Sequence, residues 1–110
     1  MALSAQQIES MATRFAFLSD STRLEILFQL LTGDRSFVEI REATEIDDCS
    51  LARQLKELRQ AGVISQNPQS SVTTYRLTDL FALRVVSVLA SSHARTPSFT
   101  PVEDRSAALG

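Results

Sequence analysis

The chain has 110 residues, a hydrophobic fraction of 44%, a charged fraction of 22% and a formal net charge of −2. This length favours one domain with a single core, and the negative charge argues against a polybasic protein that binds DNA without sequence preference. A single cysteine excludes an intrachain disulfide and favours a cytoplasmic location. The N-terminal residues contain neither a basic segment nor a long apolar run, so we expect no signal peptide and no membrane span.

The first two predicted helices have different apolar patterns. Residues 5–18 carry apolar side chains at three- and four-residue steps, which build one stripe. The stripe consists of Ile8, Met11, Phe15 and Leu18. Residues 21–32 form the second helix, and Asp20 is suited to cap its first turn. Apolar residues cover much of the circumference of this second helix, so we expect it to lie at the centre of the core.

A short third helix is predicted over residues 36–43. Ser36 and Glu39 have the spacing of a capping box, in which each side chain pairs with a backbone amide near the other. Val38 and Ile40 supply the apolar side chains of this helix.

The fourth predicted helix, residues 48–61, has an apolar base and a polar outer face. Asp47 is suited to cap it, and Gly62 to end it, because glycine adopts positive φ without strain. The apolar base consists of Leu51, Leu55 and Leu58. The opposite face carries Arg53, Lys56 and Gln60, with Cys49 at its leading end. A helix with these two faces is suited to insertion into a DNA major groove.

The chain after Gly62 predicts a small β-hairpin and a last helix. Residues 63–65 and 72–77 have strand composition, and residues 67–71 form a turn cluster between them. Residues 79–92, capped by Thr78 or Asp79, form a helix that is apolar almost all round. Its narrow polar stripe consists of Arg84, Ser87 and Ser91. We expect part of this surface to be buried against another subunit.

These elements divide the chain into a folded part and a tail. We expect residues 1–92 to form one DNA-binding and dimerisation domain and residues 93–110 to be a mostly disordered tail, because the latter combine prolines, hydroxyl residues and scattered charge. The order α-α-α-α-β-β-α is mainly helical with a small β-hairpin (α+β), as in a winged helix-turn-helix.

Three segments resemble the ArsR/SmtB family of dimeric bacterial repressors. Residues 17–27 (FLSDSTRLEIL) resemble the second-helix signature of that family, and residues 51–64 (LARQLKELRQAGVI) resemble its recognition helix and the exit into the wing. Residues 75–78 (YRLT) match the end of its wing. The resemblance implies a homodimer whose 48–61 helices enter successive major grooves of a palindromic operator in double-stranded DNA.

The resemblance further implies that the dimer is built from the first and last helices. The interface residues expected on this basis are Ile8, Met11, Phe15, Val85, Val86 and Leu89. The same stripes are open to a second interpretation, a hydrophobic pocket for an effector.

The sequence departs from the family at its metal-sensing positions. The cysteine pair of the family aligns with Ser36 and Val38, neither of which supplies a thiolate. The last helix offers Asp79, but the nearest histidine is His93. We therefore expect no metal site of the family type and no cofactor, and no motif identifies the effector.

The expected DNA contacts come from the fourth helix. Arg53 faces the groove and has the geometry to pair with guanine O6 and N7. Gln54, at the side of the helix, is expected to reach adenine or phosphate, and Ser50 and Lys56 to contact phosphate. Asp48 either accepts from cytosine N4 or serves the helix dipole.

The wing and the second helix give weaker signals. The wing tip is uncharged, so Thr74 would contact phosphate only through its hydroxyl. Arg76 is assigned equally to phosphate contact or to a surface ion pair. Arg23 is expected to pair with Asp20 or Glu25 rather than to contact DNA.

Cys49 has two interpretations. As a redox switch, it would release DNA when oxidation or alkylation adds bulk or charge at the groove. Otherwise it is a small residue without a regulatory role, which is the interpretation we favour from sequence.

A second class of function also remains open. The charges over residues 47–59 cancel, which favours a winged-helix protein–protein interaction module that has lost DNA binding. A continuous positive surface made by Arg53, Lys56, Arg59 and Arg76 would favour DNA binding instead. An enzyme is least supported, because no nucleophile–base pair and no phosphate-binding glycine loop is recognisable.

Overall fold

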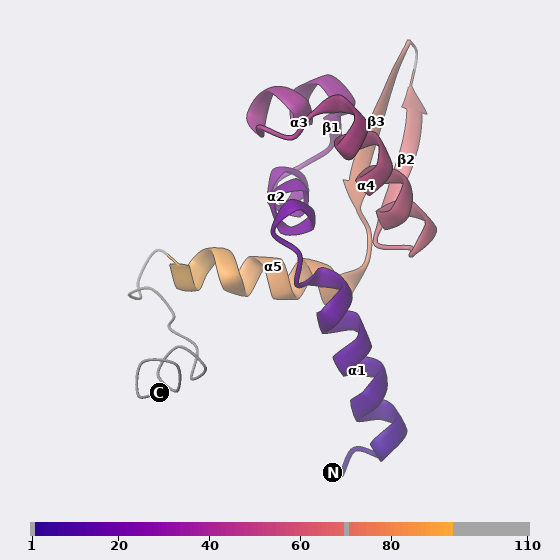
Figure 1. The fold of residues 1–110 in the computed structure, drawn as a ribbon, viewed down its shortest axis with the longest axis vertical. Helices are drawn as coiled ribbons and strands as arrows, with labels where there is room; N and C mark the ends of the chain where they lie inside the picture. The colour runs from indigo at the N-terminus through magenta and orange to yellow at the C-terminus, as the bar shows by residue number, and fades with distance from the viewer. Residues whose placement is uncertain (1, 70, 94–110) are drawn as a thin grey trace, which may run out of the picture.

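The computed structural model describes residues 2–69 and 71–93. These residues form, in order, α1 (Ala5–Leu18), α2 (Ser21–Leu30), β1 (Arg35–Ser36), α3 (Phe37–Ala43), α4 (Asp48–Gln60), β2 (Ile64–Gln69), β3 (Val72–Leu77) and α5 (Leu80–His93) (Figure 1). The predicted winged helix-turn-helix order is confirmed, with β1 as an additional short strand. Except for its first residue, the predicted 93–110 tail lies outside the described residues.

The helices begin where their sequences provide caps. The Asp20 carboxylate accepts a hydrogen bond from the Thr22 backbone N–H (3.2 Å) at the start of α2. Ser36 and Glu39 form the predicted capping box, with the Ser36 hydroxyl accepting from the Glu39 N–H (3.1 Å) and the Glu39 carboxylate from the Ser36 N–H (2.8 Å). A second capping box, between Ser4 and Gln7, starts α1. These side chains pair amide groups that the helix itself leaves unpaired.

Helix α4 ends as predicted at Gly62, which has φ of 79°. The Gly62 N–H donates to the Arg59 carbonyl and the Val63 N–H donates to the Leu58 carbonyl, both at 3.0 Å. This pair of hydrogen bonds is a Schellman motif, which requires a left-handed residue at the glycine position. It turns the chain directly from α4 into β2.

The core lies where α2 meets the other helices and the sheet. The largest completely buried side chains are Ile26, Leu27, Ile40, Leu51, Leu58 and Val86. Two of them belong to α2, as its broad apolar circumference predicted. Val86 was expected at the dimer interface and has 0% exposure in the single chain. That prediction is wrong, because this part of α5 packs against α2.

The strands form an antiparallel sheet with the order β1-β3-β2. The wing is longer than predicted: β2 pairs with β3 from Ile64 opposite Leu77 to Gln69 opposite Val72. Pro68, expected in a turn, lies within β2 opposite Thr73. An edge strand tolerates proline where the missing N–H faces away from the neighbouring strand.

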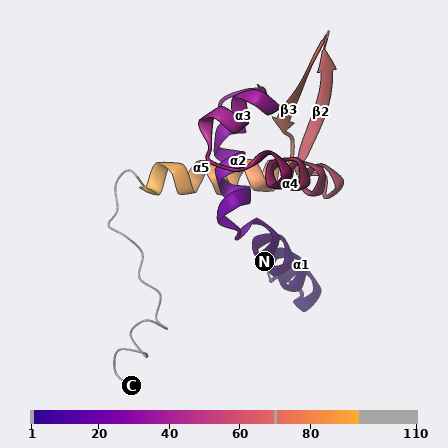
Figure 2. The ribbon, with the colours of Figure 1, turned by 45° about the horizontal axis from the view of Figure 1, so that its top comes forward.

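Two helices project from the body of the molecule. In both views α1 extends away from the body formed by α2–α4 and the sheet, and the C-terminal part of α5 extends from it in another direction (Figures 1 and 2). The body therefore holds α4 and the wing on one side and presents α1 and α5 on another. Within the described ranges, no helix is long and apolar enough to cross a membrane.

Candidate nucleic-acid interface

Helices α3 and α4 form the two helices of the helix-turn-helix, joined by residues 44–47. Thr44 is buried in the turn, where its hydroxyl donates to the Ile40 carbonyl at 2.9 Å. Asp47 then caps α4 by accepting from the Ser50 N–H at 3.0 Å. The turn is therefore held at both ends by side chains, which fixes how α4 leaves α3.

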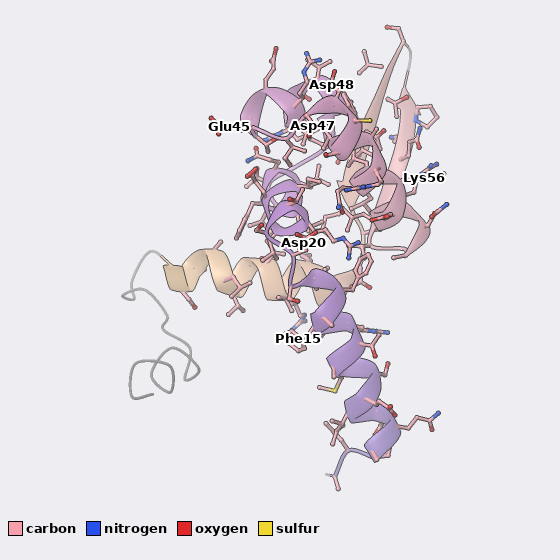
Figure 3. All side chains as sticks on the ribbon, viewed as in Figure 1. Phe15, Asp20, Glu45, Asp47, Asp48 and Lys56 are labelled. Atoms are coloured by element: carbon pink, nitrogen blue, oxygen red, sulfur yellow. The ribbon has the colours of Figure 1, made fainter. Side chains whose placement is uncertain are left out.

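The outer face of α4 carries exposed cationic side chains. Arg53 and Lys56 are both exposed, whereas the leucines of the predicted base are buried. Within the described part of the chain, neither Arg53 nor Lys56 forms an ion pair. Lys56 lies along α4, on the side of the helix toward β2 (Figure 3). Cys49 is also exposed, at the start of the same helix.

The N-terminal end of α4 is acidic. Glu45, Asp47 and Asp48 lie at the α3–α4 end of the molecule (Figure 3). Asp48 is 65% exposed and lies 3.4 Å from the Arg41 guanidinium, so one of these charges is partly balanced. The position of Asp48 in the first turn fits its helix-dipole role, one of its two predicted roles. Ser50 is half-buried, and its N–H is used in the cap.

Gln54 is not on the outer face. Its side chain is 8% exposed, and its amide oxygen accepts a 2.9 Å hydrogen bond from Nε of Arg23. The predicted contact of Gln54 with DNA therefore does not fit its position. Arg23 makes its shortest ion pair with Glu57 of α4, at 2.9 Å, whereas its predicted partner Asp20 lies at 3.9 Å. This connection between α2 and α4 was not predicted from the sequence.

The wing has little free positive charge. Of the two roles predicted for Arg76, the ion pair is present: its Nε and Nη2 donate to the two carboxylate oxygens of Asp34, at 2.9 and 3.1 Å. Thr74 is half-buried, and its hydroxyl donates to the Asn67 carbonyl at 3.4 Å. Arg76 therefore does not add a free cation to Arg53, Lys56 and Arg59 of α4, as a continuous positive surface would require.

We expect Asp47 and Asp34 to make folding stability depend on acid pH. Hydrogen bonds from the N–H and then the hydroxyl of Ser50 lower the pKa of Asp47, and the hydrogen bond and charge of Arg76 lower the pKa of Asp34. Each carboxyl thus has a lower pKa in the folded state than in the unfolded state, where it is about 3.9. The stabilisation is complete above the unfolded pKa and is lost as the pH falls through the folded pKa. Urea midpoints should therefore decrease below about pH 4.

The variant Asp47→Asn provides the control, because asparagine caps a helix but does not ionise. The stability of this variant relative to the wild type should increase as the pH falls from about 6 to about 3. A difference between the two proteins that is independent of pH would contradict the role of Asp47.

The described residues contain hollows but no evident metal site. No group of three or more His, Cys, Asp or Glu side chains among them is placed to hold a metal ion. Ser36 uses its hydroxyl in the capping box, and Val38 is an exposed apolar residue. The side chains of α1 and α5 border an open apolar hollow of about 340 Å3. Its lining residues are Phe15, Phe81, Arg84, Val85, Val88 and Leu89.

Comparison with known proteins connects this arrangement to one family. Residues 20–66, which run from the α2 cap into the wing, match the family model of the bacterial regulatory protein arsR family. The transcriptional repressor BigR from Xylella fastidiosa is 25% identical, with a TM-score of 0.69 over 86% of this chain and 100% of that chain. No curated protein sequence matches the chain.

Two further solved structures share the fold at lower identity. The antimony-specific transcriptional repressor AntR is 18% identical, with a TM-score of 0.74 over 87% of this chain and 90% of that chain. The transcriptional repressor PagR of Bacillus anthracis is 16% identical, with a TM-score of 0.68 over 78% of this chain and 99% of that chain. The helix-turn-helix segment of the chain is therefore similar to the arsR family of bacterial regulatory proteins, and its winged fold is that of these repressors.

Proposed function

We propose that this chain is a cytoplasmic repressor that binds DNA as a homodimer, reads a palindromic operator and responds to no metal at the family-type positions. The observation that carries this proposal is the outer face of α4, where Arg53 and Lys56 are exposed and unpaired within the described residues. A surface helix with free cations on one face suits a major groove, which admits a helix and presents acceptor atoms on guanine. The negative charge of the chain elsewhere limits binding to DNA approached from this face.

The proposed homodimer uses α1 and α5. Of the ten large hydrophobic side chains exposed among the described residues, six lie on these two helices. They are Ile8, Met11, Phe15, Leu80, Val88 and Leu89. Exposed apolar side chains gathered in this way indicate a surface that is covered in the working protein. We favour this interpretation over an effector pocket because the hollow is open and its walls are almost entirely apolar.

The proposed DNA contacts follow the position of each side chain. Arg53 reads a guanine edge and Lys56 contacts phosphate. Ser50 contributes less to phosphate binding than the sequence predicts, because its N–H and its hydroxyl donate to Asp47. Cys49 is exposed at the start of the same helix, where oxidation of a regulatory thiol would weaken binding and a residue without a regulatory role would have no such effect. Thr74 and Arg76 make at most a secondary contribution, because both already have partners within the wing or beside it.

The test is a salt-dependent DNA titration of the purified protein. The probes are the DNA upstream of its own gene and a scrambled duplex, each with and without reductant. We expect the protein to prefer the upstream DNA, and we expect its affinity to fall steeply with salt concentration because the release of counterions drives binding. A dependence on reductant that Cys49→Ser abolishes would assign the redox role to Cys49.

The acidic start of α4 and the balanced charge of Arg76 favour one other candidate, a protein–protein interaction module. Absence of binding to either duplex at low salt would support this candidate and contradict the repressor. Equal binding to both duplexes would support DNA binding but would show that the upstream DNA does not contain the operator.

A further inference from the structure

Arg23 of α2 is surrounded by acceptors from two other helices. Its Nη1 donates to the Phe17 carbonyl at the end of α1, its Nε to the Gln54 amide oxygen and its Nη2 to the Glu57 carboxylate, each at 2.9 Å. The guanidinium carbon also lies 4.0 Å from the centre of the Phe17 ring. We call Arg23, Phe17, Gln54 and Glu57 the Arg23 cluster. It joins the end of α1, the start of α2 and the middle of α4 at one planar group.

The Arg23 cluster constrains the orientation of α4. Gln54 and Glu57 are three residues apart and therefore lie on one side of the helix, the side toward α2. Arg53 precedes Gln54 and Lys56 precedes Glu57, so each exposed cation is about 100° around the helix from a residue held by Arg23. Fixing two points on the inner side of a rigid helix fixes the direction in which its outer side chains point. Apolar packing of the leucine base alone leaves rotation about the axis less well defined, because dispersion contacts lack direction.

We propose that Arg23 is a positioning residue for DNA recognition, which sets the rotation of α4 through Gln54 and Glu57 without touching DNA itself. Its side chain is only 19% exposed, and its three donor groups are occupied within the protein. This proposal rests on the DNA-binding role of α4. Arg23 thus determines how well the base contact is aligned, and it does not contribute to the electrostatic attraction between α4 and the phosphates.

The positioning role requires the guanidinium group of arginine and not only a positive charge. The rigid guanidinium fork serves three acceptors at once, whereas the lysine ammonium is a point charge on a flexible stem. Arg23→Lys therefore keeps the charge but not the geometry. We expect it to weaken operator binding roughly tenfold or more, the scale of one misaligned base contact. Binding to scrambled DNA should be nearly unchanged, as should the slope of log affinity against log salt.

The salt slope separates positioning from contact. A side chain that neutralises a phosphate lowers the slope by about one when it is removed. A slope that falls with Arg23→Gln, which removes the charge, or an operator affinity of Arg23→Lys equal to that of the wild type, would overturn the proposal. If the wild type binds neither duplex, the proposed function fails together with this inference. If the wild type binds and Arg23→Lys binds equally well, only the positioning role fails.

A second pair of variants tests the α4 end of the cluster, where a change is less disruptive to the fold. Glu57→Gln and Glu57→Leu both remove the same charge, but only Glu57→Gln keeps an oxygen acceptor for Arg23. The side chain of Glu57 is 41% exposed, so both variants should fold, which thermal unfolding would verify. We expect Glu57→Leu to bind the operator more weakly than Glu57→Gln. Equal affinity of the two variants would overturn the proposal.

Discussion

Replacing Leu89 by glutamate is expected to convert the protein to a monomer and to weaken operator binding by about 10²–10⁴-fold. Leu89 lies on α5, is 43% exposed and lines the apolar hollow together with Phe15 of α1. Phe15 in turn packs edge-to-face on Phe81, with ring centres 5.2 Å apart. A carboxylate placed in this surface would have to give up its hydration when a second subunit covers it. A monomer binds each half-site separately, so the increase in affinity that comes from joining two DNA-binding subunits in one dimer is lost.

Light scattering during gel filtration gives the mass, and titration of the full operator and of a single half-site gives the two affinities. Leu89→Met is the matched control, because it conserves volume and apolar character at the same position. It should remain dimeric and bind like the wild type. A Leu89→Glu protein that is still dimeric and binds the operator normally would exclude this part of α5 from the interface.

The ends of the helices could be predicted because each is capped by a residue close to it in the sequence. Asp20, Ser36 and Asp47 each pair with an amide two or three residues away, so the same short segment contains the cap and its partner. Gly62 ends α4 for a similarly local reason, since the Schellman hydrogen bonds span only six residues. Features that depend on sequence separations this short are visible without tertiary structure.

The positions of Gln54 and Val86 could not be predicted in the same way. Gln54 lies at the edge between the inner and outer faces of α4, and its partner Arg23 is 31 residues earlier in the chain. Val86 lies on a helix that is apolar almost all round, so periodicity does not distinguish the side that packs on α2 from the side left exposed. In both cases, the burial of the side chain depends on which other element of the fold packs against that side of the helix.

The wing shows how pairing overrides local preference. Asn67 and Pro68 have turn composition, yet both extend β2 because β3 supplies a partner strand as far as Val72. Arg35 and Ser36 likewise form β1 only because Tyr75 and Thr74 lie beside them. The family resemblance identified the wing, but its length and its third strand follow from long-range hydrogen bonding.

The charge distribution is compatible with the proposed binding of this acidic protein to DNA. Three negative groups near the interface are committed locally: Asp47 to the cap of α4, Asp48 to Arg41 and Asp34 to Arg76. The cations on the outer face of α4 have no such partner in the described residues. In the proposed complex, affinity for DNA therefore depends on few positive charges, and specificity depends on how well those few are aligned with the bases. This dependence makes Arg53 the side chain with the largest expected effect on base recognition.

Arg53→Ala should reduce operator affinity by about 1–3 kcal/mol for each half-site, the value of a bidentate arginine–guanine contact. Because a dimer would carry two copies, the loss for the full palindrome should be about twice as large. The variant should also stop discriminating at one base pair in each half-site. Titrations against operators substituted at each base pair in turn would identify that position.

Arg59→Ala is the matched control, since Arg59 is an exposed arginine in the last turn of the same helix. Removing it deletes the same charge without removing the side chain proposed to read the base. It should leave the pattern of base preference unchanged and alter affinity similarly for operator and scrambled DNA. If Arg53→Ala also weakened both duplexes by the same factor, Arg53 would act as a charge alone, and base recognition would have to come from other side chains of the α4 outer face.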